Sequence, residues 1–364
     1  MVRPGTVNNG NSRKSYRIAV DAFGGDLAPA EPVKGGVEAA ACYPDTSILL
    51  VGPSGAIREE LDAIGDIPPN VGIVEASDVI GMHESAVAAL RNKKNSSITI
   101  GTKLVKEGGA DAFLSAGNTG AMVAAGSYHL GLLPEVLRPG IALPIIAIDH
   151  PVLIMDVGAN INCKPEHLLQ YGVMASVFAG EVMEMKEPRV GLLNVGEEER
   201  KGTDLQKKAF GMLEAAPVNF VGNVEAHDIF FGGCDIVLCE GFTGNVLLKT
   251  CESLIQKLLE YLESEIANSL RRRLGFALCS DVFKVTRRVT DYAEYGGAAL
   301  LGVDGVIIIS HGRSDAKAIK SAVREARSTL KYDVNRDIAA ALDSLKNRPD
   351  FTDTQTETDN EQPV

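Results

Sequence analysis

Short apolar segments alternate along this chain with segments in which apolar residues recur every three or four positions. Residues 17–23 are typical of a buried strand, and residues 30–42 follow as a helix with Pro32 in its first turn. The same order continues, with strands expected at 47–52, 71–76 and 112–117 and helices at 56–64 and 98–107. Strands separated by helices favour an α/β fold in which a mostly parallel sheet is sandwiched by helices.

The second half of the chain repeats this alternation. A run of small residues after Gly117 predicts a helix that can approach a sheet closely, and Pro165 suits the first position of another helix. The apolar run that starts at Arg189 is one more expected strand, and two helices should close the chain between residues 314 and 345. The remaining expected strands are 140–148, 152–158, 219–225, 236–241 and 305–312.

Residues 246–274 have the pattern of one long amphipathic helix. Its apolar positions are Leu247, Cys251, Leu254, Leu258, Leu262, Ile266 and Leu270. A second helical segment, 280–295, could fold back beside it and make a hairpin of residues 246–295. A helix of this length extends beyond a compact core, so its apolar stripe needs a partner. Two copies of the chain would supply one as an intermolecular four-helix bundle, which predicts a homodimer.

The two ends of the chain differ from the 16–348 domain between them. Residues 1–15 lack the apolar segment of a secretory signal and are expected to be a flexible arm. Residues 349–364 carry five acidic residues and no basic one, which predicts a disordered acidic tail. The most apolar region, 141–157, is interrupted by prolines and polar residues, so no segment is expected to cross a membrane.

Composition excludes some classes of partner. The formal net charge of −12, the absence of Trp and the 5% aromatic content argue against nucleic-acid binding, which requires clustered cations and stacking rings. The six cysteines form no C-x-x-C pair, so reduced thiols and a cytoplasmic location are expected. Because the net charge is negative, an anionic partner must bind at a local basic patch.

Glycine-containing polar turns follow six of the expected strands. One such turn alone is usually ordinary loop chemistry, but six on strands that share an edge would line a cleft with backbone N–H groups, amides and cations. Such a cleft suits phosphate and an oxyanion. The turns are 20–26, 115–120, 156–167, 194–204, 239–245 and 310–312.

The turn at 194–204 contains the loop Glu197–Lys201, with three acids and two bases. Taken alone it could be a solvated, self-neutralising loop. Arg200 and Lys201 instead indicate an anionic ligand if the loop lies beside the other turns. Cys163 next to Lys164 is a possible nucleophile, although a spectator thiol is the commoner case. Asp21, Asp26 and Asp156 could hold a divalent metal, but capping or turn roles are favoured, and neither a metal nor a cofactor is expected.

Several motifs in order resemble one known family. They are VDAFGGD, RNKKNSS, SAGNTGA, DVGAN, KPEHL, GLLNVG, the ERKG step, GNVEA, GFTGNV, and YGGA followed by GVIIISHG. Over residues 17–330 the chain resembles the bacterial phosphate acyltransferases of phospholipid synthesis, which use acyl carrier protein. P-loop, hydrolase-elbow, zincin and Rossmann motifs do not occur in the sequence.

The resemblance implies a fold similar to the isocitrate dehydrogenase and phosphotransacetylase group. It also implies synthesis of acyl phosphate from acyl carrier protein and inorganic phosphate, and delivery of that product to a membrane acyltransferase. Lys201 and Asn245 match the residues that look catalytic in the family. The expected substrate-binding residues lie in the six turns: Asp21, Gly24, Gly25, Asn118, Thr119, Asp156, Asn160, Lys164, Arg200, Thr243 and His311.

The segment 271–288 forms the tip of the expected hairpin and carries six basic residues against one acid. One interpretation is a solvated helix end whose arginines satisfy the helix dipole. The other is a tip that touches acyl carrier protein or an anionic membrane surface, giving peripheral association without insertion.

Two further functions stay open at the level of sequence. One is a nicotinamide-dependent hydroxy-acid dehydrogenase of the same fold group, although no substrate-arginine cluster or nucleotide loop is evident. The other is a non-catalytic module that binds lipid or carrier protein. The chain departs from the family pattern at Phe23, His227 and Arg313, where Met, Arg and Ser are frequent.

Overall fold

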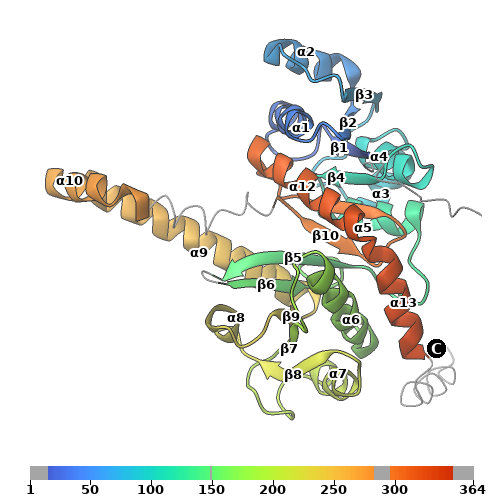
Figure 1. Ribbon diagram of the computed structural model, residues 1–364, viewed down its shortest axis with the longest axis vertical. Coiled ribbons are helices and arrows are strands. Elements are labelled where there is room, and N and C mark those ends of the chain that lie inside the picture. Colours follow the sequence, from blue (N-terminus) through green and yellow to red (C-terminus); the bar gives the residue numbers. More distant parts are fainter. Residues whose placement is uncertain (1–14, 148–149, 283–295, 347–364) are drawn as a thin grey trace, which may run out of the picture.

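The computed structural model describes residues 15–147, 150–282 and 296–346. Its centre is one eleven-stranded sheet in the order β3-β2-β1-β4-β11-β10-β5-β6-β9-β7-β8 (Figure 1). The expected arm and acidic tail lie outside the described residues, apart from Ser15. The strands are β1 Tyr16–Asp21, β2 Thr46–Gly52, β3 Val71–Glu75, β4 Ala112–Ser115, β5 Gly140–Ala147, β6 His150–Met155, β7 Arg189–Leu193, β8 Asn219–Val224, β9 Ile236–Leu238, β10 Ala298–Leu301 and β11 Val306–Ile309.

The sheet reverses direction near its middle. Strands β3, β2, β1, β4 and β11 are parallel to one another, and β6, β9, β7 and β8 form a second parallel group. The pairs β11–β10, β10–β5 and β5–β6 are antiparallel, so the second group runs opposite to the first. The expected mostly parallel sheet is confirmed, with this antiparallel centre as the added feature.

Each face of the sheet is covered by a layer of helices because alternate strand residues point to opposite faces. In β1, Ile18 and Val20 join the core of one face and Ala19 that of the other. The first layer is α1 Ala30–Cys42, α2 Ser54–Ile64, α6 Pro165–Glu181, α7 Asp204–Glu214, α12 Ala316–Tyr332 and α13 Val334–Lys346. The second is α3 Ala86–Asn92, α4 Ser97–Lys106, α5 Thr119–Ala125, the π-helical turn η1 Gly126–Leu130, α8 Asp228–Phe231 and the start of α9 Gly241–Ala267.

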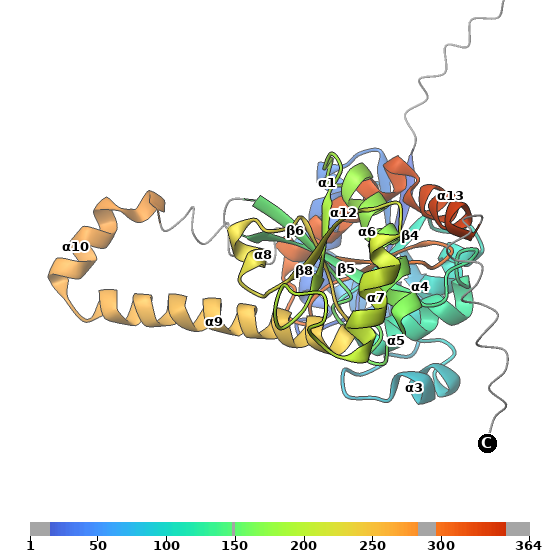
Figure 2. The same ribbon diagram turned by 90° about the horizontal axis from the view of Figure 1, so that it is seen from below.

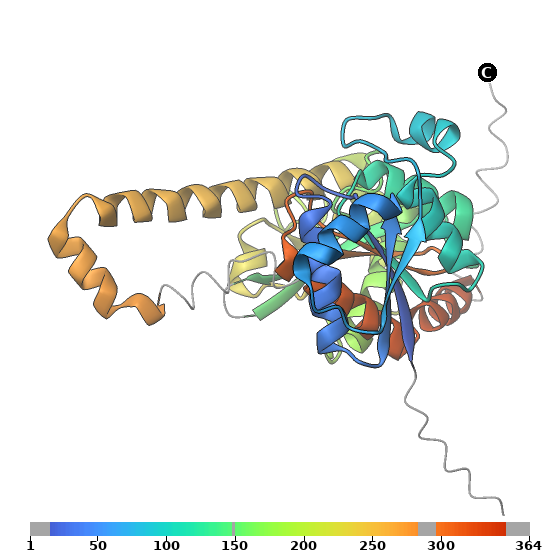
Figure 3. The ribbon, with the colours of Figure 1, turned by 90° about the horizontal axis from the view of Figure 1, so that it is seen from above.

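Helix α9 leaves the core and ends in a short helix, α10 Leu270–Leu278 (Figures 2 and 3). The expectation of one helix over 246–274 is wrong at both ends. The helix starts earlier because the Glu240 carboxylate caps it, and it breaks at Asn268 and Ser269, of which Ser269 has extended backbone angles. Residues 280–282 are helical, while the rest of the second helix expected at 280–295 lies outside the described residues.

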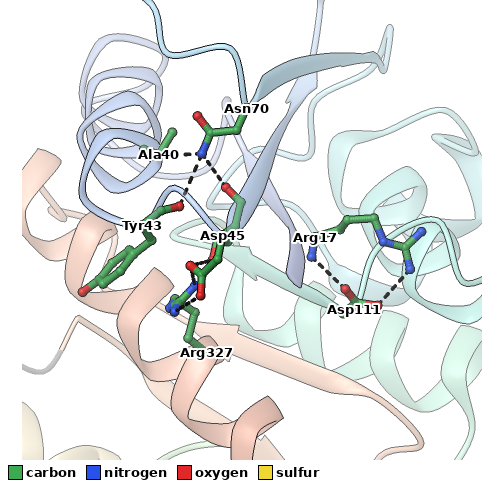
Figure 4. Close-up of polar contacts among 8 residues, drawn as sticks. Arg17, Ala40, Tyr43, Asp45, Asn70, Asp111 and Arg327 are labelled. Atoms are coloured by element: carbon green, nitrogen blue, oxygen red, sulfur yellow. Dashed lines mark hydrogen bonds and ion pairs between the residues drawn. The ribbon is translucent and has the colours of Figure 1, made fainter. Parts of the chain in front are cut away.

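Polar side chains tie the helices to the strand ends in the first half of the sheet (Figure 4). Arg327 of α12 donates to both oxygens of Asp45, at 2.6 and 3.0 Å, and its guanidinium lies over the rings of Tyr16 and Tyr43. The Asn70 amide donates to the carbonyls of Ala40, Tyr43 and Thr46. These contacts fix the start of β2 between α1 and α12. They involve the amino end of β2 and not its carboxyl end.

Candidate active site

The six turns do not share one edge of the sheet, and that expectation is wrong. The turns after β1, β4 and β11 lie at one edge, which also holds the end of β5. The turns after β6, β9 and β7 lie at the opposite edge, beside the start of β5. The antiparallel β10 and β5 cause the split, since carboxyl ends gather at one edge only while strands stay parallel. Lys201 and Asn245 both belong to the second group.

The three strands of this second group are direct neighbours. Leu238 of β9 pairs with Met155 of β6 on one side and with Leu192 of β7 on the other. The turns that follow are therefore held side by side. A Cβ built at Gly158 would lie 3.8 Å from the Asn245 Cβ, so the β6 turn lies against the N-terminal part of α9.

Asp156 organises the β6 turn from within. Its buried carboxylate accepts hydrogen bonds from the backbone N–H groups of Ile141, Gly158, Ala159 and Asn160 at 2.7–3.0 Å. Burial raises the pKa of this carboxyl, and the N–H donors act in the opposite direction. Because its oxygens are already engaged, the predicted substrate-binding Asp156 acts here as the anchor of a loop.

Asn160 and Lys164, also in this turn, have different surroundings. The Asn160 amide nitrogen donates to the Pro139 carbonyl at 2.5 Å and to the Tyr171 hydroxyl at 2.7 Å, so it points inward. Lys164 is exposed at the start of α6, where its backbone N–H donates to His167 Nδ1. Nearby, burial raises the pKa of Cys163 to about 11, which opposes a thiolate nucleophile.

The first turn of α9 packs tightly against this loop. The Gly241 N–H donates to the Asn160 carbonyl at 2.7 Å, and a Cβ added at Gly244 would meet the backbone of Asp156. Glu240 accepts from the N–H groups of Phe242 and Thr243 and from the Thr243 hydroxyl. The hydroxyl of Thr243, a predicted substrate-binding residue, is thus hydrogen-bonded to Glu240. Asn245 lies one turn along the helix from its start.

Lys201 comes from the loop between β7 and α7. Its side chain is half exposed, and its Nζ lies 3.8 Å from a Glu198 carboxylate oxygen, while Arg200 is also exposed. The solvated, self-neutralising loop is thus present in part. It nevertheless begins next to the turn that leads into Asn245, because β7 and β9 are paired.

The other edge of the sheet holds a second polar cluster. Asp21 is buried and accepts from the Ser115 hydroxyl at 2.6 Å and from the Phe23 N–H at 3.0 Å. Burial raises its pKa. Gly24 lies against Ser115 and Gly117, and Gly25 has a φ of +100° and packs on the Gly312 carbonyl. These glycines allow the turns after β1, β4 and β11 to meet.

Asn118 and Thr119 begin α5 at this edge. The Asn118 side chain caps the helix through the Ala121 N–H and donates to the carbonyls of Gly81, Met82 and Glu84, so both ends of its amide have internal partners. These contacts give Asn118 a structural role, and its role in substrate binding stays a prediction. Thr119 is exposed.

Helix α9 connects the two edges. His311, which follows β11, places Nε2 3.8 Å from a Glu252 carboxylate oxygen on α9. Burial raises the pKa of Glu252, against the opposing charges of His311, Lys249 and Arg313. Asn245 and Glu252 are seven residues apart, about 10 Å along a helix. The two groups of turns thus both reach α9, although they lie at opposite ends of the strands.

Sequence reasoning missed several residues that build this site. Glu240, Gly244 and Asn223 were not singled out. Glu is not among the residues preferred at an N-cap, so the capping of α9 by Glu240 gave no recognisable signal in the sequence. In the described ranges, no three His, Cys, Asp or Glu side chains lie close enough together to hold a metal ion. None of the helices described in the structure combines the length and apolar composition needed to cross a bilayer.

The arrangement of strands and helices defines a class of protein. It is similar to a phosphotransacetylase from Streptococcus pyogenes, with a TM-score of 0.59 and 15% identity over 88% of this chain and 95% of the other. It is also similar to a 4-hydroxythreonine-4-phosphate dehydrogenase from Klebsiella pneumoniae, with a TM-score of 0.51 and 14% identity over 87% and 98% of the two chains. The chain therefore has the α/β fold shared by these transacylases and dehydrogenases.

Sequence comparison is more specific than the fold. Residues 16–337 match the family model described as fatty acid synthesis protein. The chain is 49% identical over 312 residues to a phosphate acyltransferase of Heliobacterium modesticaldum, covering 85% of this chain and 93% of that protein. It is 45% identical over 340 residues to one of Desulfitobacterium hafniense, covering 93% and 99%. The chain belongs to this family of phosphate acyltransferases.

Proposed function

We propose that this protein transfers an acyl group from acyl carrier protein to inorganic phosphate and releases acyl phosphate. The observation that carries the proposal is the placement of Lys201 and Asn245 in the segments that follow two paired strands in a chain of the phosphate acyltransferase family. The product is a mixed anhydride suited to a second acyl transfer. We therefore propose a membrane acyltransferase as its acceptor, in the acyl-phosphate route to phosphatidic acid.

The reaction needs neither a metal nor an activated serine. An oxygen of hydrogen phosphate attacks the thioester carbonyl, a C–O bond forms, and the carbonyl oxygen becomes an oxyanion. Collapse of this intermediate breaks the C–S bond, and the sulfur takes the proton that the phosphate brought. Phosphate is already anionic and a thiol is a good leaving group, so positioning and charge stabilisation are the main demands.

We assign Lys201 to the phosphate and to the negative charge that develops in the transition state. Asn245 is assigned to the thioester carbonyl or the phosphate, since a neutral amide can donate to either oxygen. Lys164, Arg200 and Thr243 remain candidates for substrate contacts around them. Asp156 and Asn160 would contribute indirectly, by fixing the loop against which α9 packs.

The opposite edge supplies the remaining candidates for binding. Gly24, Gly25, Thr119 and His311 belong to the turns after β1, β4 and β11, and His311 lies beside Glu252 of α9. A carrier protein spans both edges more readily than phosphate does. We therefore propose that this second cluster contacts the acyl carrier protein or its prosthetic group.

One experiment tests the reaction. The protein is incubated with acyl carrier protein charged with a fatty acid and with phosphate, and both hydroxylamine-trappable acyl phosphate and free thiol are measured. Equal amounts of the two products are expected. Absorbance changes with either nicotinamide cofactor would favour the dehydrogenase instead, and binding without consumption of phosphate would favour a non-catalytic module.

We also propose a homodimer built on α9. Leu254, Leu258 and Tyr261 are exposed on the part of the helix that leaves the core. A single copy offers them no cover in the described residues, and a second α9 would provide an apolar stripe of the same kind. Light scattering should give a dimer that Leu258→Glu weakens and that Ser253→Glu, on the same helix, leaves intact. A Leu258→Glu protein that stays fully dimeric would rule out this interface.

Helix α10 supports a proposal of peripheral membrane contact by a cytoplasmic protein. Leu270, Leu274 and Leu278 are exposed there together with Arg271, Arg272 and Arg273. Arg272 pairs with Glu265. The other basic residues of the expected 271–288 tip lie outside the described residues. Apolar and cationic groups together suit an anionic lipid surface.

Flotation with anionic liposomes tests the membrane contact. The parent protein should float at low salt, and replacement of the three arginines by Glu should abolish flotation. Equal flotation of the two proteins would contradict an electrostatic contact at this helix.

A further inference from the structure

The loop between β7 and α7 owes its shape to side chains. Two backbone–backbone hydrogen bonds support residues 194–202 among those that the structure describes: Asn194 N–H to the Val224 carbonyl at 2.8 Å and Lys201 N–H to the Glu198 carbonyl at 3.0 Å. The second closes a four-residue turn from Glu198 to Lys201. A surface loop with so few backbone bonds would be mobile unless other groups held it.

Asn194 holds one end of this turn. Its side-chain oxygen accepts from the Val195 N–H at 2.8 Å, and its amide nitrogen donates to the Lys201 carbonyl at 3.1 Å. Gly202 makes the approach possible, because a Cβ there would lie 2.5 Å from the Asn194 oxygen. Its φ of +83° also belongs to the region that favours glycine.

Asn223 holds the other end from the neighbouring strand. It lies on β8, is 6% exposed, and donates from its amide nitrogen to the Glu198 carbonyl at 2.9 Å. The Glu198 carbonyl thus receives both this bond and the one that closes the turn. Two asparagines therefore fix the first and last carbonyls of the turn. Asn194, just after β7, holds the Lys201 carbonyl, and Asn223, on β8, holds the Glu198 carbonyl.

We propose that Asn194 and Asn223 are positioning residues that hold Lys201 at the distance from Asn245 that the reaction requires. The proposal rests on the proposed function for its kinetic consequences. Both residues touch the backbone of the loop and leave the Lys201 ammonium group for the substrate. An amide suits this task because it donates a hydrogen bond without bringing a charge. A carboxylate at either place would lose the donor and would attract the lysine away from phosphate.

A purely structural role makes a different prediction. Loss of a hydrogen bond that merely stabilises the fold lowers the melting temperature and affects activity in every background. A residue that acts through Lys201 loses its effect on turnover once the lysine is gone, because the two changes then remove the same contribution. A double-mutant cycle with Lys201→Met separates these cases.

The experiment compares Asn194→Ala and Asn223→Ala with Asn219→Ala as the matched control. Asn219 lies on the same strand as Asn223 and donates to the Glu187 carbonyl at 2.8 Å, away from the site. We expect kcat for acyl phosphate formation to fall about tenfold to a hundredfold in the two site variants, since small displacements of a catalytic group have effects of this size. In the Lys201→Met background the same changes should alter kcat less than twofold. The control should match the parent protein in both backgrounds.

Amide hydrogen exchange gives a readout that does not depend on activity. The Lys201 N–H is bonded to the Glu198 carbonyl, so its exchange should accelerate at least tenfold in Asn223→Ala and stay unchanged in the control. Unchanged exchange, or equal losses of kcat with and without Lys201, would overturn the inference. If the parent protein makes no acyl phosphate, the proposed function fails, while exchange still decides whether the asparagines hold the loop.

Discussion

Gly244 is the position where the smallest chemical change should disturb the proposed site most. A Cβ there would lie 2.9 Å from the carbonyl carbon of Asp156 and 3.0 Å from Sγ of Cys239, and closer still to the Asp156 carbonyl oxygen. Since Cβ atoms stay at least 3.0 Å from such neighbours, the first turn of α9 would have to withdraw by about 1 Å. Asn245 is the next residue and would move with it.

The magnitude of this effect follows from two opposing terms. Alanine in place of glycine favours a helix by about 1 kcal/mol, whereas overpacking against backbone costs about 1–3 kcal/mol, so the net loss of stability should be at most about 2 kcal/mol. A displacement of a catalytic group by about 1 Å can lower turnover about a hundredfold. Gly244→Ala should therefore lower activity much more than stability.

The assay for Gly244→Ala combines thiol release from the acyl carrier protein with a thermal melt. The matched control is Gly275→Ala on α10, where an added Cβ would meet no atom within 4 Å. We expect the control to retain the parent turnover and to melt at the same temperature or slightly higher. A Gly244→Ala protein with parental kcat would refute the link between α9 packing and Asn245.

Three further changes have definite expected outcomes. Lys201→Met keeps the aliphatic stem of a half-exposed side chain and removes one donor, so kcat should fall about 10²–10³-fold with an unchanged melting temperature; a parental kcat would exclude the lysine from the mechanism. Asn245→Asp should be less active than Asn245→Ala because a carboxylate repels phosphate, and the reverse order in the thiol assay would contradict an anion-facing role. Burial raises the pKa of Glu325 to about 7, so the folded protein holds this proton more tightly than the unfolded chain and loses stability as pH rises from about 4.5 through 7. Glu325→Gln should therefore melt higher than the parent at pH 8 but not at pH 4, and parallel melting curves across that range would show that the carboxyl does not titrate as described.

The sequence was most informative where structure is local. Helix α1 has the predicted bounds. Each predicted strand is present, and most of the observed strand ends lie within two residues of the predicted ones, because apolar periodicity and turn residues act over short distances. The parallel pairing of β7 with β9 fits the predicted mostly parallel sheet, although the sequence did not indicate which strands would be neighbours. The same local signals did not reveal β10, since a run of four small and apolar residues fits a helix as well as a strand.

The direction of the strands could not be predicted in the same way. It depends on which strands pair across long separations, such as β10 with β5, and no local pattern encodes this choice. The roles of single polar residues were equally ambiguous. A carboxylate at a strand end, such as Asp156, has the same appearance in sequence whether it binds a ligand or collects backbone N–H groups. Asn223 gave no signal, because a polar residue within a strand is usually solvent-facing.

Asn245 lies close to the fixed end of helix α9, so a rotation of the helix about that end moves Asn245 much less than it moves α10. Its 27 residues span about 40 Å at the usual rise of an α-helix, and most of that length extends beyond the core (Figure 3). A tilt of about 5° about its first turn displaces the far end by about 3.5 Å over this length. Conversely, a contact that moves α10 by a few ångströms changes the position of the first turn only slightly. The close packing of Gly241 and Gly244 against the β6 turn thus keeps Asn245 in place when the distant end of the helix moves.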